Sequence, residues 1–450
     1  MVRFSIIIPT TDRHELLQHS LRSFLTMDRD DLEIIVSDNF STPETHAVVD
    51  AHRQDGRLKY YRTDRRLAMP DHWDFAWRKA SGRYVIFNCD DDGLSASGLA
   101  KIDRAIEALD PQLLCWPIAL YYHPDYDSEG GANALAFPAG HSNLDLLLDP
   151  LRIVERYARF ECHFFPEGTH CCIARELGER IMRDTGRLFW PPAPDFTASL
   201  LTLGAGARYC YIDSMLGFGG RSRSSNAASV SGRPGEGRIQ QFFSEFGDQD
   251  MYPHHPCKAK LYCNYHFAAH SLLLKYYPAF SPARPDLNKF LCLAQEELLS
   301  DRPSPLIDER TQRLFDEYVA GLDAGGQKLA EEARQHVLQR KASPRTPSEI
   351  ARSLTPAGVK TAAERVLTRL GLYKRTAAVR RIEGATNGFR HAFDVFANWD
   401  RIVAQYDITS LANVSAAYEG NLIVSAHRQV GAEKSSAGER DLPLARTSHA

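Results

Sequence analysis

One predicted strand, Tyr84–Phe87, is followed closely by three consecutive carboxylates, Asp90, Asp91 and Asp92. Its residues are β-branched or aromatic and uncharged, which is typical of a strand buried on both faces of a parallel sheet. Ligands of open α/β sheets bind at the carboxyl edge of the strands. Three adjacent negative charges repel one another, and a divalent cation with oxygen ligands neutralises such a group. The stretch predicts a metal and substrate site. The alternative is a solvated turn that caps the next helix.

The length of 450 residues predicts two or three domains. A net charge of −3 gives no signal for a nucleic-acid partner. The nine cysteines contain no CxxC pair, which indicates free thiols in a reducing compartment rather than zinc ligands or a disulfide framework. Residues 2–9 read as a strand rather than a signal peptide, and no stretch has the length of a membrane span. These features predict a cytoplasmic protein.

Strands and helices are predicted to alternate over the first 90 residues. The predicted strands are Phe4–Pro9, Leu32–Ser37, Leu58–Arg62 and Tyr84–Phe87, with helical patterns between them. Such alternation predicts an α/β domain with a mostly parallel sheet and helices on both faces. The loop after the first strand, Pro9–Arg13, contains neither GxGxxG nor a P-loop, so a dinucleotide fold is not predicted. The polar loop and the acids that follow the second and fourth strands indicate a nucleotide-sugar site.

Four motifs in order, SIIIPTTDR, EIIVSDNFS, MPDHWDFAWRKASGRYVIF and DDD, resemble the family-2 glycosyltransferases with the GT-A fold. The resemblance is clear over about residues 3–110 and weaker to about residue 225. It implies an enzyme that transfers a sugar with inversion from a nucleoside-diphosphate sugar to a glycan or lipid-linked acceptor. Bacterial cell-surface polysaccharide synthesis is the process that the resemblance implies.

The resemblance also implies a donor-binding set on the first three strand ends. Asp38 would accept hydrogen bonds from the nucleobase, and Thr10 and Asp12 would lie near the base and the ribose. Arg65 and Arg66 lie where the family often carries a basic residue that faces the nucleotide. An ordinary turn at Asp38 and a solvated loop at the two arginines are the alternatives.

In the family, a DxD motif binds the metal and the ribose or diphosphate of the donor. Asp90 and Asp92 form such a motif here, with Mn²⁺ or Mg²⁺ as the implied cofactor. Asp91 could take either role, because three adjacent acids leave the register of the motif open by one position.

Asp195 stands at the entry of a predicted helix, after a loop rich in proline. Family-2 enzymes carry an acid at this place, which acts as the general base on the acceptor hydroxyl. A carboxylate can do this only within hydrogen-bond reach of that hydroxyl. Pro194 replaces the acid that often precedes it in the family, and a plain helix cap is the alternative.

A loop with glycine, serine and arginine, residues 219–226, follows the last strand of the predicted domain. Guanidinium forks match phosphate oxygens, and backbone N–H groups near glycine can approach a diphosphate closely. Arg221 and Arg223 are therefore predicted to bind the donor. A disordered serine-rich linker is the alternative.

The middle of the chain is predicted to be less regular, with a strand over 113–122, a loop or hairpin over 125–140 and a helix over 144–160. Helices are predicted from residue 258 onward. His266 and His270 lie four residues apart on one of these helices. The aromatic residues around them favour packing over a metal site, since no HExxH pattern is present.

The predicted domains are a GT-A catalytic domain over 1–225, a helical extension over 226–345, a basic helical segment over 346–430 and a disordered tail over 431–450. Residues 334–381 carry twelve cations and two anions, a net charge of +10. A basic amphipathic helix here would make peripheral contact with an anionic membrane and would bind it less tightly as salt rises. The alternative is a solvated helix within a helical extension.

Two other functions fit parts of the sequence. One is a non-catalytic relative that binds nucleotide sugars or glycans. It is distinguished from an enzyme by whether Asp92 and Asp195 face one cavity. The other is a nucleotidyltransferase, which would need a glycine-rich loop bearing Lys or Arg after the first strand, and Pro9–Arg13 provides little of this.

Overall fold

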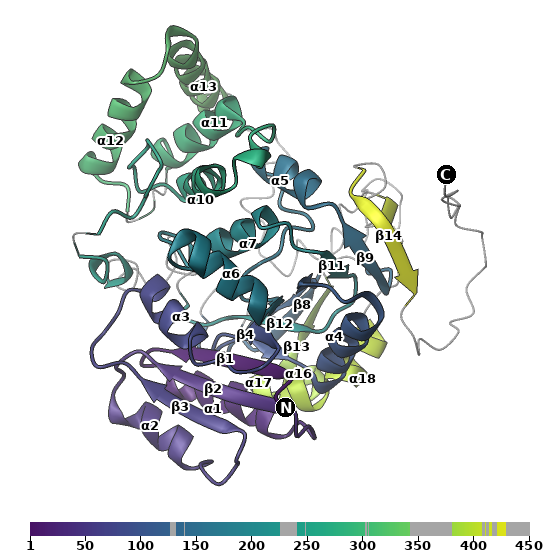
Figure 1. Cartoon of the computed structure of the whole chain (residues 1–450). Helices are drawn as coiled ribbons and strands as arrows, with labels where there is room; N and C mark the ends of the chain where they lie inside the picture. The colour runs from purple at the N-terminus through teal and green to yellow at the C-terminus, as the bar shows by residue number, and fades with distance from the viewer. Residues whose placement is uncertain are drawn as a thin grey trace, which may run out of the picture.

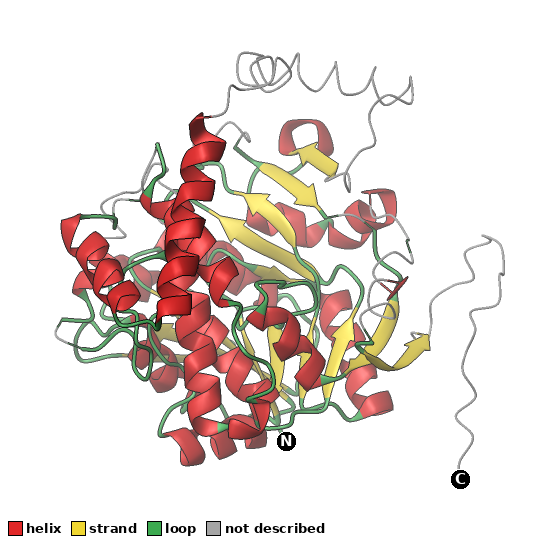
Figure 2. Ribbon diagram, turned by 90° about the horizontal axis from the view of Figure 1, so that it is seen from above, coloured by secondary structure: helices red, strands yellow, loops and turns green. Residues whose placement is uncertain are grey.

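Two β-sheets form the centre of the molecule, and helices cover them (Figures 1 and 2). The computed structural model describes residues 1–126, 132–138, 140–225, 241–247, 249–301, 304, 306–342, 380–406, 410, 414–415 and 421–428. The nine-stranded sheet has the order β14-β9-β11-β6-β10-β4-β1-β2-β3, and the five-stranded sheet has the order β13-β8-β7-β12-β5.

The strands of the larger sheet are β1 (Phe4–Thr10), β2 (Leu32–Asp38), β3 (Leu58–Arg62), β4 (Tyr84–Phe87), β6 (Leu113–Cys115), β9 (Leu144–Leu148), β10 (Cys171–Ala174), β11 (Tyr209–Ile212) and β14 (Ile423–Arg428). Those of the smaller sheet are β5 (Gly93–Leu94), β7 (Ala119–Tyr122), β8 (Ala134–Phe137), β12 (Gly217–Arg221) and β13 (Arg380–Glu383).

The first four strands of the larger sheet confirm the predicted α/β alternation. They run parallel in the order β3-β2-β1-β4, so that Ile7 of β1 pairs with Ile35 on one side and Phe87 on the other. Their connections are α1 (His14–Leu25), α2 (Pro43–Asp50) and α3 (Met69–Trp77). Beyond β4 the sheet is mixed, because β10 is antiparallel to both β4 and β6. The prediction of a mostly parallel sheet therefore holds for this N-terminal part.

β1 is buried on both faces, as its uncharged sequence predicts. Ile7 packs into a core with Trp73 of α3, whereas Ile6 and Ile8 pack into a second core on the other face. That second core also contains residues of α1 and α4 (Ala96–Leu109). Helices on both faces thus fix the sheet and leave the loops at its carboxyl edge to form a site.

Two predictions for the region after α4 were wrong in detail. The predicted strand over 113–122 is two strands in different sheets, β6 and β7, with Pro117 between them. The predicted loop or hairpin over 125–140 contains β8, which pairs antiparallel with β7, so the hairpin alternative is confirmed. The predicted helix over 144–160 begins as β9, and α5 (Pro150–Ala158) starts only after Asp149, whose side chain accepts from the Leu151 N–H. All five residues of β9 are buried in the sheet, so pairing with the neighbouring strands overrode the helical pattern of this stretch.

The helical extension is confirmed. In the view of Figure 1 it lies above α6 (Arg175–Thr185) and α7 (Pro194–Gly204). It comprises α10 (Tyr262–Tyr276), the short helix η1 (Pro278–Phe280), α11 (Leu287–Leu298), α12 (Glu309–Ala320) and α13 (Ala324–Ala342). α10 packs against α7 and α11. His266 lies between the rings of Phe196 and Tyr157, which agrees with the predicted packing role.

The chain returns to both sheets after the extension. β13 pairs with β8, and β14 pairs with β9 at the edge of the larger sheet (Figure 1). Between them come α16 (Gly384–Asn387), α17 (Ala392–Ala397) and α18 (Trp399–Tyr406), and α17 packs against α1. Most of the basic stretch 334–381, namely residues 343–379, lies outside the described residues, and so does the predicted tail, 431–450. The predicted domain boundaries stay a prediction, although the described part of 346–430 contains strands as well as helices.

The described helices include none that combines the length and the apolar character needed to cross a membrane.

Gly82, just before β4, gives the first test. A Cβ atom at this residue would lie 2.7 Å from the backbone nitrogen of Ser5 and 2.8 Å from the carbonyl carbon of Phe4. We expect Gly82→Ala to lower the free energy of unfolding by about 2 kcal/mol, the scale of overpacking in a core. Gly56→Ala is the matched control, because its Cβ would meet nothing within 4 Å. Urea unfolding measures both, and equal midpoints for the two variants would contradict the packing described here.

Candidate active site

A cavity of about 410 Å³ lies at the carboxyl ends of β1 and β4. Side chains from the β1 loop, the acidic stretch, α7 and α10 line it together. They include Thr10, Asp12, Arg13, Arg66, Cys89, Asp91, Asp92, Glu167, His170, Asp195, Arg221 and Tyr262. Asp92 and Asp195 therefore face the same cavity, which is the feature that distinguishes an enzyme from a non-catalytic relative.

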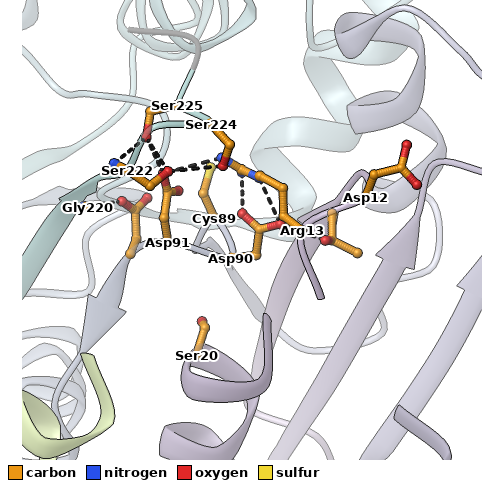
Figure 3. Close-up of polar contacts among 12 residues, drawn as sticks. Asp12, Arg13, Ser20, Cys89, Asp90, Asp91, Gly220, Ser222, Ser224 and Ser225 are labelled. Carbon is orange, nitrogen blue, oxygen red and sulfur yellow. Dashed lines mark hydrogen bonds and ion pairs between the residues drawn. The ribbon is translucent and has the colours of Figure 1, made fainter. Parts of the chain in front are cut away.

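Asp90 is buried and is held by Arg13 of the β1 loop (Figure 3). Arg13 forms an ion pair with its carboxylate, and the Arg13 Nε–H donates to Asp90 Oδ2 at 3.1 Å. The Thr10 hydroxyl donates to the same oxygen at 2.6 Å. Asp90 is 1% exposed and is not among the residues that line the cavity. Its carboxylate thus serves to fix Arg13 and the loop after β1.

Asp91 and Asp92 are held by β12 and by the segment that follows it. The Ser225 hydroxyl donates to Asp91 Oδ2 at 2.6 Å, and the Gly220 N–H donates to Asp92 Oδ1 at 2.8 Å. A Cβ atom at Gly220 would lie 2.0 Å from the Asp91 carbonyl oxygen, so only glycine allows this approach. His170 Nε2 lies 3.7 Å from Asp92 Oδ2. The β1 loop and residues 220–225, which are distant from each other in the sequence, thus both contact the acids.

Burial and neighbouring charges shift the pKa values of the three acids in different directions. Burial raises the pKa of Asp90, an effect that Arg13 opposes and the Asp91 charge reinforces. Burial and the Asp91 charge also raise the pKa of Asp92. The pKa of Asp91 is lowered, because Arg13 and the Ser225 hydrogen bond outweigh the effect of burial. Three such groups cannot all ionise without further positive charge.

The cavity contains a group of side chains that could hold a metal ion. The ligand atoms of Cys89, Asp91 and Asp92 lie within 4.8 Å of one another. Two carboxylates facing a polar cavity suit the hard cations Mg²⁺ and Mn²⁺. The sequence left open which two of the three acids form the DxD motif. This geometry favours Asp91 and Asp92 over Asp90 as metal ligands. The assignment of Asp90 as a metal ligand stays a prediction that no contact supports.

Asp195 lies in the first turn of α7 and lines the cavity. Burial raises its pKa, and the nearby backbone N–H groups of the helix start oppose this in part. No ion pair to Asp195 occurs among the residues that the structure describes. A carboxylate with a raised pKa and no cation beside it is a better proton acceptor than an ordinary Asp.

The other predicted site residues divide into two groups. Thr10, Asp12, Arg66 and Arg221 line the cavity with the residues described above. Arg65 and Arg223 are exposed and do not line it. Arg66 forms an ion pair with Asp12, so one basic residue of the 62–66 loop is held toward the β1 loop.

Asp38 is fully buried and does not line the cavity, whereas the next residue, Asn39, does. The Tyr60 hydroxyl and the Ser41 N–H donate to its two carboxylate oxygens at 2.5 and 2.8 Å. Arg62 Nε lies 3.7 Å from it. These contacts match the alternative of a local turn, and the nucleobase role of Asp38 stays a prediction.

Sequence reasoning missed several residues of the site. Arg13, Gly220, Ser225, His170 and Tyr262 either line the cavity or hold its acids, but none was singled out. The signal available for Arg13 was its charge. It lies in the motif PTTDR of the loop after the first strand, where a cation can pair with the predicted acid cluster. His170 and Tyr262 had no such signal, because folding alone brings them to the cavity.

The fold and the cavity define an α/β protein with a carboxylate cluster at the ligand-binding edge of its sheet. Residues 5–133 match the family model described as glycosyl transferase family 2. A curated relative, the GalNAc(5)-diNAcBac-PP-undecaprenol beta-1,3-glucosyltransferase of Campylobacter jejuni, is 36% identical over 104 residues. These residues are 23% of this chain and 34% of the relative, so the chain matches about a third of that protein's length.

The match of residues 5–133 to this family model confirms the resemblance to family-2 glycosyltransferases that the sequence predicts. Among solved structures, S. aureus TarS 1-349 in complex with UDP-GlcNAc superposes with a TM-score of 0.44 and 14% identity, over 76% of this chain and 93% of that one. The mannosyltransferase PcManGT from Pyrobaculum calidifontis, in complex with GDP-Man and Mn²⁺, gives 0.36 and 17%, over 75% and 88%.

Arg13 gives a test of how the acid cluster is held. We expect Arg13→Ala to lower the free energy of unfolding by about 3 kcal/mol, because removing one partner leaves a buried charge uncompensated. Adding Asp90→Asn should restore part of the loss. Urea unfolding of the single and double variants measures this, with Arg65→Ala on an exposed side chain as the control. An Arg13→Ala variant as stable as the wild type would show that the ion pair does not hold the loop.

Proposed function

We propose that this chain transfers a sugar with inversion from a nucleoside-diphosphate sugar to a hydroxyl of a glycan or lipid-linked acceptor. The observation that carries the proposal is the shared cavity, which Asp91, Asp92 and Asp195 all line. The family-2 segment over residues 5–133 supports it. The C. jejuni relative is named as a glucosyltransferase of a PP-undecaprenol-linked saccharide, which supports a lipid-linked acceptor. A role in cell-surface polysaccharide synthesis is part of the proposal.

The donor would lie along the strand ends, with its diphosphate toward Asp91 and Asp92. A divalent cation held by these two carboxylates would neutralise the charge that develops on the leaving diphosphate. Arg221 lines the same part of the cavity as Gly220, and its guanidinium suits phosphate oxygens. Arg13, fixed by Asp90, keeps the β1 loop and Thr10 in place at the other end.

Asp195 would take the proton of the acceptor hydroxyl as its oxygen attacks the anomeric carbon. The oxygen approaches from the face opposite the diphosphate, so the new bond has inverted configuration and the nucleoside diphosphate leaves. Asp195 and Asp92 line one cavity, so an acceptor hydroxyl at Asp195 and a donor at Asp92 would share the same space. The raised pKa of Asp195 matches the role of a proton acceptor.

The requirement for a divalent cation is tested first. We expect hydrolysis of one nucleotide sugar in a panel, in the presence of Mn²⁺ or Mg²⁺, and loss of this activity in excess chelator or in Asp92→Ala. Asp50→Ala, at an exposed residue of α2, should keep full activity. Full activity in chelator would reject the metal assignment, and no hydrolysis of any donor would favour a non-catalytic binding protein.

The role of Asp195 is tested by Asp195→Asn. We expect transfer to fall roughly a hundredfold, the scale of general-base loss, with donor affinity nearly unchanged. In the wild type, transfer should fall as pH decreases through the raised pKa of Asp195, because the protonated acid cannot accept a proton. The variant should lose this pH dependence. Donor titration and initial rates measure both effects, and a collapse of donor affinity would make Asp195 structural.

A further inference from the structure

The helical extension contributes a side chain to the cavity. Tyr262, the first residue of α10, lines the cavity and is 50% exposed. Its neighbours Cys263, Asn264 and Tyr265 are buried. Large aromatic residues are usually buried in a fold of this size. A ring left half exposed in a concave site is therefore available to contact a ligand.

Tyr262 is held in place from the next helix. The carboxylate of Glu297 on α11 accepts from the Tyr262 N–H at 2.7 Å and from the Cys263 N–H at 2.8 Å. A carboxylate at the start of a helix satisfies backbone donors that would otherwise lack partners. The start of α10 is thus fixed, so the ring of Tyr262 projects into the cavity from a rigid element.

A row of packed rings joins Tyr262 to the helix that carries Asp195. The Tyr262 ring centroid lies 5.8 Å from that of His266, in an edge-on arrangement. The His266 ring lies 4.5 Å from Phe196, the residue after Asp195. Burial lowers the pKa of His266 to about 4, so this ring is neutral at neutral pH. The tyrosine and the acid therefore belong to one packed wall.

The charged groups that act on the Tyr262 ring are two acids and one arginine. Burial raises the pKa of Tyr262, and the charges of Asp195 and Glu167 raise it further, while Arg221 acts in the opposite direction. Asp195 and Glu167 both line the cavity. A ligand with its own carboxylate would meet two acids here, and such repulsion excludes wrong ligands.

We propose that Tyr262 is the stacking wall of an acceptor subsite that takes an uncharged pyranose ring and presents its hydroxyl to Asp195. The inference rests on the proposed function and adds the class of acceptor. One face of a galactopyranose ring consists largely of C–H groups, which suit an aromatic surface, and the hydroxyls at its rim remain free for polar groups. The acidic surroundings select a neutral ring over a uronic acid.

Saturation-transfer NMR with methyl β-D-galactopyranoside tests the subsite without turnover. We expect the strongest saturation at the ring hydrogens H3, H4 and H5, because they share the face that stacks on the tyrosine. Methyl β-D-galactopyranosiduronic acid, which differs only by its carboxylate, should give a weaker signal. Tyr262→Ala should reduce the galactoside signal about fivefold, the scale of one ring-stacking contact, and Tyr262→Phe should retain it. Leu338→Ala, at an exposed residue of α13, is the control and should not change it.

Donor hydrolysis, measured in parallel, separates this inference from the proposed function. Hydrolysis that is unchanged in Tyr262→Ala, together with the lost galactoside signal, supports an acceptor subsite. A signal that persists in Tyr262→Ala, no signal in the wild type, or equal signals from the galactoside and the galacturonide would overturn it. Loss of donor binding in Tyr262→Ala would place the ring on the donor side and would also overturn it. Absence of hydrolysis in the wild type would instead count against the proposed function.

Discussion

The buried ion pair between Arg13 and Asp90 is the interaction on which the site depends. It joins the loop after β1 to the acids after β4, and it supplies positive charge where three carboxylates lie side by side. Breaking such a pair is costly because the remaining charge has no water to solvate it. With Asp90 occupied in this way, Asp91 and Asp92 are the acids left to face the cavity.

Two segments far from the first strands complete the arrangement. The Gly220 N–H and the Ser225 hydroxyl, more than 120 residues after the acids, hold Asp92 and Asp91 in place. α7 brings Asp195 to the cavity, and α10 packs on α7 and adds Tyr262. The extension is therefore part of the wall of the site as well as an appended bundle, and the segment over residues 5–133 that matches the family model provides only part of the cavity lining.

Some predictions depended on local patterns and others on tertiary pairing. The strand and helix alternation over residues 4–87 was predictable, because strands buried on both faces leave a continuous apolar run. Residues 144–148 carry leucines that suit a helix or a strand equally, and only pairing with β11 and β14 made them β9. Asp38 stood at the predicted strand end, yet contacts with Tyr60 and Ser41 turned its carboxylate away from the cavity lining.

The sequence by itself determined the α/β class and the acidic edge of the sheet, because both follow from residue types over a short stretch, and the family resemblance pointed to Asp195 as the candidate base. Only the tertiary structure decided which two of the three acids face the cavity, since that depends on where Arg13 and Thr10 lie in space. The tertiary structure also decided that Asp92, Asp195 and Tyr262 share one cavity. Asp195 and Tyr262 lie about 100 and 170 residues after Asp92 in the sequence. They come together only when the sheet, α7 and α10 have packed, and a local sequence pattern cannot predict contacts over such separations.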